Sequence, residues 1–451
     1  MEKLSASLEQ LLRDARIDLV LSRIEKDSSI IEEVIKLVDS EIRSIRFNSI
    51  FTLGAIGELA GQNAALKVAE CLDDSDWSVC REAARTLGKI GLLTESSITK
   101  LSNLGSNDEV TIRIAVASSL GQIGKATNEA IKALKQLLKD KNEEVRSEAA
   151  RSLGIFGTEA YEAIPDLMNS MKDPNWTVRT SAAQAISNIG KGTIKAIPTL
   201  INALEDKDWR VRFRVVNTLS QIGEETVPHL LNILNHKSSI VRIGAIESLG
   251  ELKLPKPEII TALSNKLIDK NSQIRGKAAD ALRSIGKPAV PALIEVLKSA
   301  NKKIKILIIT AIAGIGIDAQ DSIPQIITEL KDQKTSVRLE AARTLGAIGK
   351  DSEDAIIALS EALNDEKSVI RKEAALSLGK IGPNAIKVVP SLLKVLDDKK
   401  PDVRWRASEA LGKIKLNTPE VINALESMIH DECDYVCESA EVAIENIKEN
   451  Y

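Results

Sequence analysis

The fold of this chain depends on one stretch, Val145-Arg146-Ser147-Glu148-Ala149-Ala150-Arg151-Ser152-Leu153-Gly154-Ile155-Phe156-Gly157. Variants of this stretch recur from one end of the sequence to the other, and the residue equivalent to Leu153 marks each copy. The markers are Leu53, Leu87, Leu120, Leu153, Ile186, Leu219, Leu249, Leu282, Ile312, Leu345, Leu378, Leu411 and Ile444. Successive markers are 33 residues apart in most cases, 34 apart once and 30 apart twice. Self-similarity at a period of this size indicates a solenoid, in which each unit packs against its neighbours.

The repeated stretch has the pattern of an amphipathic helix. Val145, Ala149 and Leu153 follow one another at steps of four, so their side chains fall on one helix face. Gly157 comes where a helix can end in the left-handed conformation, which glycine adopts without steric cost. The copies that keep this glycine have it at Gly57, Gly91, Gly124, Gly157, Gly190, Gly223, Gly286, Gly316, Gly349 and Gly382.

A second helix is predicted after each of these glycines, as in residues 163–171. A proline recurs near its start, at Pro165, Pro198, Pro228, Pro291, Pro324 and Pro390. Proline is tolerated in the first turn of a helix, where its missing N–H has no partner to lose. Each unit is therefore predicted to be a helical hairpin that buries its apolar faces by stacking on its neighbours.

The residues resemble a known repeat family. Asp173-Pro174-Asn175-Trp176-Thr177-Val178-Arg179, followed by Ala182-Ala183, is similar to the short form of the HEAT repeat that is named after phycobilisome lyases. The resemblance covers about residues 40–450 and implies an all-α, right-handed superhelix of about 13–14 hairpins. It also implies a ladder in which an Asp and an Arg six residues apart link each hairpin to the next. The ladder pairs are Asp140 and Arg146, Asp173 and Arg179, Asp206 and Arg212, Asp332 and Arg338, Asp365 and Arg371, and Asp398 and Arg404.

Some copies depart from the ladder. Cys80 and Cys437 stand in place of the Arg, while Ser40, Asn107, His236 and Ser299 stand in place of the Asp. The two shortened copies fall between about residues 220 and 310. We expect the local superhelix geometry to change there, which makes this region a candidate flexible or recognition segment.

The uninterrupted repeat predicts one continuous solenoid domain. Residues 1–39 match the motif weakly and are predicted to form a degenerate capping repeat. Residues 40–435 are the repeat array, and residues 436–451 are predicted to be a polar C-terminal cap.

Composition restricts the range of functions. The formal net charge is −3 over 451 residues, which argues against a general nucleic-acid binder. The first residues lack the basic and apolar regions of a secretory signal, and the longest nearly apolar run, residues 306–317, is too short to span a bilayer. Four cysteines without a regular framework indicate a reducing compartment. We expect a cytoplasmic protein with no membrane partner.

One row of side chains is a candidate binding surface. It occupies the position four residues after the recurrent proline, on the second helices, which line the concave face in the family. Its members are Asn103, Gln136, Asn169, Asn202, Asn232, Asn265 and Glu295. An Asn side chain offers both a donor and an acceptor, which suits the backbone of an extended peptide, and a similar asparagine ladder serves that purpose in armadillo repeats. The alternative is that these are ordinary exposed residues copied with the repeat.

The histidines and cysteines give little support for catalysis. None of His229, His236 and His430 is followed by Glu, which excludes deoxyhypusine hydroxylase, a short HEAT-repeat enzyme whose di-iron site uses His-Glu dipeptides. His430 lies close in sequence to Asp431, Cys433 and Cys437, and a metal site there is an alternative to ordinary cap residues. We favour the ordinary residues and predict no catalytic site, no metal and no cofactor.

Three tryptophans share one position in the repeat. Trp77, Trp176 and Trp209 each lie three residues before the ladder arginine or its substitute. This fixed position is typical of a packing device at the start of the first helix. An exposed row for stacking nucleic-acid bases is the alternative.

These features favour a scaffold or adaptor that binds a protein or peptide along the concave face of the solenoid, an inference that rests on the fold. Two alternatives remain open. Resemblance to phycobilisome lyases implies a possible lyase subunit that handles a bilin chromophore. A nucleic-acid-binding HEAT-like protein would require a basic concave face.

Overall fold

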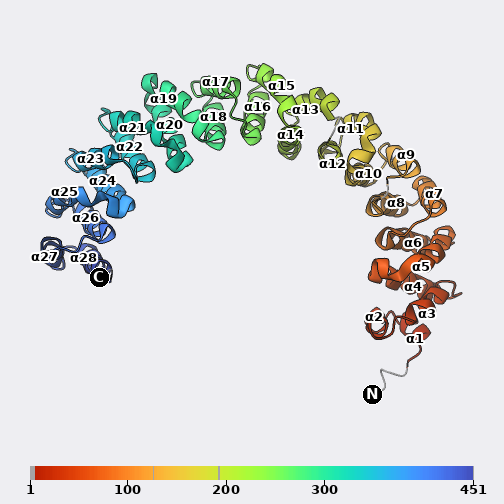
Figure 1. Ribbon diagram of the computed structural model, residues 1–451. Helices are drawn as coiled ribbons and strands as arrows, with labels where there is room; N and C mark the ends of the chain where they lie inside the picture. The colour runs from red at the N-terminus through yellow and green to blue at the C-terminus, as the bar shows by residue number, and fades with distance from the viewer. Residues whose placement is uncertain (1–5, 125, 191–192, 450–451) are drawn as a thin grey trace. The chain divides into compact units, whose positions relative to one another are not determined.

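The computed structural model describes residues 6–124, 126–190 and 193–449. Across these residues the regular structure is helical, without a strand, which confirms the predicted all-α solenoid. The chain divides into two compact units, Met1–Leu230 and Leu231–Tyr451. Figure 1 shows that each unit is a stack of helical hairpins in two layers.

The first unit contains one layer of first helices and one layer of second helices. The first helices are α4 (Arg43–Ile56), α6 (Trp77–Ile90), α8 (Val110–Gln122), α10 (Glu143–Ile155), α12 (Trp176–Ile189) and α14 (Trp209–Ile222). The second helices are α5 (Gly61–Glu70), α7 (Glu95–Asn103), α9 (Asn128–Leu137), α11 (Ile164–Ser170) and α13 (Ile197–Ala203). The boundary between the units falls inside α15 (Val227–Ile233).

The second unit repeats this arrangement. Its first helices are α16 (Ser239–Leu252), α18 (Ser272–Ile285), α20 (Lys302–Ile315), α22 (Thr335–Ile348), α24 (Ser368–Ile381), α26 (Pro401–Ile414) and α28 (Asp434–Lys448). Its second helices are α17 (Pro257–Lys266), α19 (Val290–Ser299), α21 (Ile323–Glu329), α23 (Glu353–Ala362), α25 (Val389–Val395) and α27 (Pro419–Met428).

The segment predicted to be the N-terminal cap has a broken first helix. α1 (Leu8–Arg13) and α2 (Ile17–Lys26) replace one first helix, and α3 (Ile30–Leu37) is the second. The break lies at Ala15, whose φ of 54° is incompatible with a right-handed helix. Residues 1–5 of the predicted N-terminal cap and residues 450–451 of the C-terminal cap lie outside the described residues.

The predicted helix ends have a clear steric basis. Pro165 lies in the first turn of α11, and the other recurrent prolines occupy the equivalent place in their helices. Nine of the ten predicted glycines have a positive φ, but Gly349 has a φ of −94°. A Cβ on Gly349 would lie 2.6 Å from the Leu345 carbonyl oxygen, so glycine is needed there for space.

The first helices pack more closely than the second helices. They contact one another far more extensively, and small residues make this approach possible. A Cβ on Gly154 of α10 would lie 2.9 Å from the Cα of Ala185 on α12. Hydroxyl groups join the same layer, because Ser119 Oγ donates to Ala84 O at 2.7 Å and Ser152 Oγ donates to Ala117 O at 2.7 Å.

This difference in spacing determines which layer is concave. In each unit the closely packed first helices lie on the inside of the curve and the second helices lie on the outside (Figure 1). The prediction that the second helices line the concave face is therefore wrong. The apolar periodicity could not reveal this, because both helices of a hairpin bury one face.

One stretch, Lys302–Glu329, is long and apolar enough by composition to span a membrane. The structure folds it as a hairpin of α20 and α21, with a φ of 77° at Gly316. Lys305 Nζ near its start lies 2.7 Å from Glu329 Oε2 at its end. A straight helix would separate two residues at this spacing by about 36 Å, so the stretch does not form a continuous span.

Candidate functional site

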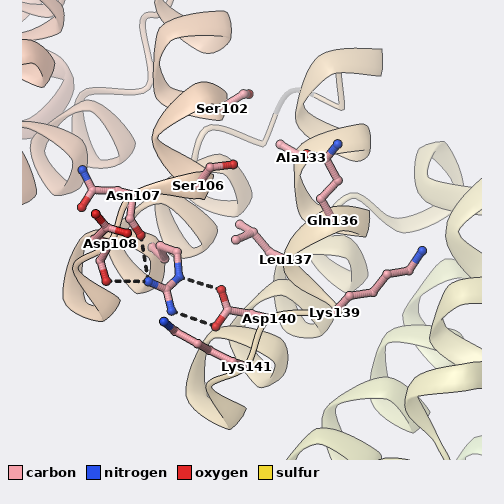
Figure 2. A pocket seen from close by; sticks show the side chains of 12 residues that line it. Ser102, Ser106, Asn107, Asp108, Ala133, Gln136, Leu137, Lys139, Asp140 and Lys141 are labelled. Atoms are coloured by element: carbon pink, nitrogen blue, oxygen red, sulfur yellow. Dashed lines mark hydrogen bonds and ion pairs between the residues drawn. The ribbon is translucent and has the colours of Figure 1, made fainter.

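Most ladder arginines contact a carboxylate of the next hairpin and two backbone carbonyls of the turn that precedes their own helix. Arg113 Nε lies 2.6 Å from Asp140 Oδ2, and Nη2 donates to Asp140 Oδ1 at 2.9 Å (Figure 2). Its Nη1 donates to the backbone carbonyls of Asn107 and Asp108 at 2.8 and 2.9 Å. The Asp140 carboxylate also accepts from the backbone N–H of Asn142 at 2.8 Å.

The carboxylate partner lies in the next hairpin, 27 residues ahead. Arg146 binds Asp173 in this way, and its own Asp140, six residues earlier, accepts only through the backbone carbonyl. The same bidentate contact joins Arg179 to Asp206, Arg338 to Asp365, Arg371 to Asp398 and Arg404 to Asp431. Arg212 keeps only the carbonyl contacts among the described residues, because His236 occupies the aspartate position.

The ladder is a structural device, because within the described residues most of its arginines are paired with a carboxylate of the next hairpin. Burial alone would raise the pKa of the Asp140 carboxyl, but hydrogen bonds from Arg113 and the Asn142 N–H outweigh it and lower that pKa. Asp398 has a lowered pKa for the same reasons, with Arg371 as the donor. Since these guanidinium groups are part-buried and already paired, they do not form a basic stripe on the surface.

The predicted row on the second helices lies on the outer layer. All seven members, Asn103, Gln136, Asn169, Asn202, Asn232, Asn265 and Glu295, are exposed. Gln136 lines a polar hollow of about 440 Å³ beside the Arg113–Asp140 pair (Figure 2). Asn169 lines a more apolar groove of about 470 Å³ with Tyr161, Pro165 and Met168.

A second candidate surface lies on the concave side, and we call it the first-helix face. It consists of the residues that point away from the second helices, at steps of four along each first helix. On α14 these are Trp209, Phe213, Asn217 and Gln221, and on α6 they are Trp77, Arg81, Arg85 and Lys89. Because four residues make about 1.1 turns, each set forms one row along its helix.

Aromatic residues gather on the first-helix face. The chain has four phenylalanines and four tryptophans, and seven of these eight residues lie on this face. They are Phe47, Phe51, Trp77, Trp176, Trp209, Phe213 and Trp405, whereas Phe156 is buried in the core. Trp209 is 64% exposed, Phe213 59% and Trp77 49%. The interpretation of Trp77 and Trp209 as packing devices is therefore wrong.

Three of the four tryptophans, Trp77, Trp176 and Trp405, instead lie against the guanidinium group of an arginine. The Arg210 guanidinium lies 3.4 Å from the centre of a Trp176 ring, and that of Arg81 lies 4.9 Å from the centre of a Trp77 ring. In such contacts the cation is attracted to the face of the ring, which favours one arrangement of the two side chains. Arg210 is also paired with Asp208 at 2.7 Å. The sequence signal for this face was the position of the aromatic residues, on the helix side opposite the apolar stripe.

The C-terminal histidine and cysteines do not assemble a metal site. No group of three potential ligands comes together anywhere in the described residues. Asp431 binds Arg404, and Cys437 Sγ donates to the Asp431 carbonyl at 3.2 Å. Cys437 thus contacts the carbonyl that a ladder arginine would contact.

Comparison with known proteins agrees with this architecture. A sequence profile described as HEAT repeats matches residues 31–121, 98–187, 164–229, 227–299, 290–379 and 358–445. No curated protein matches the sequence at a significant level.

Several solved structures share the fold. Kap121p bound to Nup53p has a TM-score of 0.61 at 16% identity, and the match covers 94% of this chain and 54% of that chain. Kap121p bound to RanGTP gives 0.59 at 16% identity, again over 94% and 54%. Importin beta gives 0.53 at 12% identity, over 98% of this chain and 73% of that one. The chain therefore spans about half the length of the Kap121p structures, and identities of this size indicate a shared fold alone.

Proposed function

Because the chain belongs to the HEAT-repeat family, we propose that it is a scaffold or adaptor that binds an extended segment of a partner protein. The binding surface is the first-helix face of the first unit, Met1–Leu230. One observation carries this proposal: six of the eight phenylalanine and tryptophan residues of an aromatic-poor chain lie on the first-helix face of this unit, and four of the six are exposed. Exposed aromatic side chains and arginines are the residues that dominate binding energy at protein interfaces.

The α14 pair is the strongest anchor on this face. Trp209 and Phe213 lie one turn apart and are both more than half exposed. Burying two such rings under a partner would remove a large apolar area from water. Kap121p, which shares the fold, has been solved with Nup53p bound and with RanGTP bound, and this supports the use of the fold for binding proteins.

The asparagine row on the outer layer is a second binding surface that we keep as a proposal. Asn169 supports it, because this side chain lines a partly apolar groove between second helices. An extended peptide in that groove would find the donor and acceptor of the amide beside apolar side chains.

One experiment separates the two surfaces. The unchanged chain, a Trp209→Ala/Phe213→Ala variant and an Asn169→Ala/Asn202→Ala/Asn232→Ala variant are used as baits in the same native lysate. Equal circular dichroism and melting temperature first establish that all three fold alike. We expect the partner to be lost from the aromatic variant and retained by the asparagine variant.

Other results would change the assignment. Loss of the partner from the asparagine variant alone would move the site to the outer layer. Retention by both variants would overturn the proposed surface. Recovery of a bilin pigment or of nucleic acid in place of a protein would favour one of the alternative functions.

Two finer assignments are also proposals. We assign the repeats to the short, phycobilisome-lyase-like form because most copies are 33 residues apart. We place the protein in the cytoplasm because all four cysteines are free thiols, which suits a reducing compartment. Fractionation of the native cells with an antibody against the chain tests that location.

A further inference from the structure

Helix α6 carries a row of cations on the first-helix face. Trp77, Arg81, Arg85 and Lys89 follow one another at steps of four. Successive side chains in the row are therefore about 6 Å apart along the helix axis. Arg85 and Lys89 are exposed, and Arg81 is half-buried.

These cations have no carboxylate partner among the described residues. None of the three forms an ion pair there, unlike Arg43 on the neighbouring α4, which pairs with Asp76 at 2.9 Å. The single acidic residue of α6, Glu82, is buried. Like charges at steps of four along a helix repel one another. An anionic ligand would relieve this repulsion, so the row is suited to bind one.

Aromatic rings hold two of the cations in place. The Arg81 guanidinium lies 4.9 Å from the centre of a Trp77 ring, and Lys89 Nζ lies 5.6 Å from the centre of the Phe51 ring on α4. Arg81 Nε is buried and has no hydrogen-bond partner within the described part of the chain. Ordering these long side chains before binding reduces the entropy that a ligand must overcome.

We propose that the α4–α6 surface binds an acidic segment of the partner protein. The inference rests on the proposed function, since it assigns a chemistry to part of the same face. Carboxylates of the segment would pair with Arg81, Arg85 and Lys89. Alternate side chains of an extended peptide lie about 7 Å apart, close to the spacing of the cations. Apolar side chains of the segment would contact Phe47 and Phe51 on one side.

The neighbouring helices favour a short acidic peptide over a nucleic-acid strand. The first-helix face of α8 is uncharged, with Val110, Ile114, Ser118 and Gln122. On α10 the face carries Glu143, Ser147, Arg151 and Ile155, and Arg151 is already paired with Glu148 at 2.7 Å. A nucleic-acid strand needs a basic groove that continues along its backbone and free rings on which bases stack. Here the basic row is one helix wide, and cations already lie over rings of Trp77 and Phe51.

The test uses the full chain and a synthetic peptide. The probe is a fluorescein-labelled peptide with three glutamates at alternate positions and leucines at both ends, and its binding is followed by fluorescence anisotropy. The test variant is Arg81→Gln/Arg85→Gln/Lys89→Gln. The control variant, Lys36→Gln/Lys132→Gln/Lys399→Gln, removes the same number of charges from exposed lysines outside both the first-helix face and the Asn169 groove. Circular dichroism and melting temperature check that both variants fold.

We expect the test variant to bind the peptide at least about tenfold more weakly, from the sum of three exposed ion pairs. The control variant should stay within about twofold of the unchanged chain, because its charges lie elsewhere. Raising the salt from about 0.05 to about 0.5 M should weaken binding to the unchanged chain. A peptide with lysines in place of the glutamates should not bind.

Three results would overturn the inference: no binding of the acidic peptide at about 1 mM, equal affinities of the two variants, or tighter binding of an oligothymidylate of equal charge. The Trp209→Ala/Phe213→Ala capture concerns a different helix. If the aromatic variant loses its partner as expected but the acidic peptide does not bind the unchanged chain, only the proposal that the α4–α6 surface binds an acidic segment is lost. If the aromatic variant keeps its partner, the proposed function itself fails.

Discussion

Arg113 shows how much of the ladder depends on the geometry of a single side chain. Its guanidinium contacts two carbonyls and both oxygens of Asp140, which a lysine ammonium cannot do at once. We therefore expect Arg113→Lys to lower the free energy of unfolding by about 2–3 kcal/mol. Urea unfolding followed by circular dichroism measures this change.

Arg212 provides the matched control. It makes the same carbonyl contacts but, among the described residues, no ion pair with a carboxylate. Arg212→Lys should cost less than about 1 kcal/mol. Equal costs for the two substitutions would mean that the carboxylate contact contributes nothing to stability.

The four cysteines should differ in reactivity. Burial raises the pKa of the Cys71 and Cys80 thiols to about 11, so almost no thiolate is present at neutral pH. Cys433 and Cys437 are only half-buried. Titration of the native protein with a disulfide reagent should therefore label Cys433 and Cys437 within minutes. Cys71 and Cys80 should react only after unfolding in denaturant, and rapid labelling of all four would contradict the burial.

At the scale of the helix, Gly154 tests the close approach of the first helices. Alanine has the higher helix propensity, by about 1 kcal/mol, yet a Cβ on Gly154 would lie 2.9 Å from the Cα of Ala185. That neighbour is backbone and can move only with its helix. We expect Gly154→Ala to destabilise the protein by about 1–3 kcal/mol, measured by urea unfolding.

Gly276 is the control for that substitution. It lies inside α18, and no heavy atom of the described residues comes within 4 Å of an added Cβ. Gly276→Ala should therefore raise the free energy of unfolding by up to about 1 kcal/mol. A gain in stability from Gly154→Ala as well would show that the first helices can separate freely.

These helices also show what the sequence could and could not predict. The spacing of Val145, Ala149 and Leu153 was sufficient to predict the helices of the hairpin, because apolar residues at steps of four form one buried face of a helix. It was not sufficient for the curvature, which depends on how closely each layer packs. The relevant signal was Gly154 with Ser152, small residues that recur on first helices. The exposed row of Trp209 and Phe213 was missed because its position was attributed to packing.

At the scale of the whole molecule, the repeated ladder should make the free energy of unfolding fall at acid pH. The pKa values of Asp140, Asp332, Asp398 and Asp431 are all lowered in the folded protein. For Asp140, Asp332 and Asp398, burial acts in the opposite direction and is outweighed by hydrogen bonds from the partner cation and a backbone N–H. For Asp431 the hydrogen bond from Arg404 is the largest cause.

A carboxyl whose folded pKa is lowered stabilises the protein above its unfolded pKa of about 3.9, and the contribution is lost as pH falls toward the folded value. We therefore expect the urea midpoint to be nearly constant from about pH 7 to about pH 5 and to fall steeply below about pH 4. Asp140→Asn should lower the midpoint at neutral pH and make the acid fall shallower, because one of the titrating groups is gone. Since solenoid stability is close to a sum over neighbouring repeats, removing a second ladder aspartate should flatten the fall further. A loss of stability centred near pH 6.5, where histidine titrates, would show that other groups control the acid response.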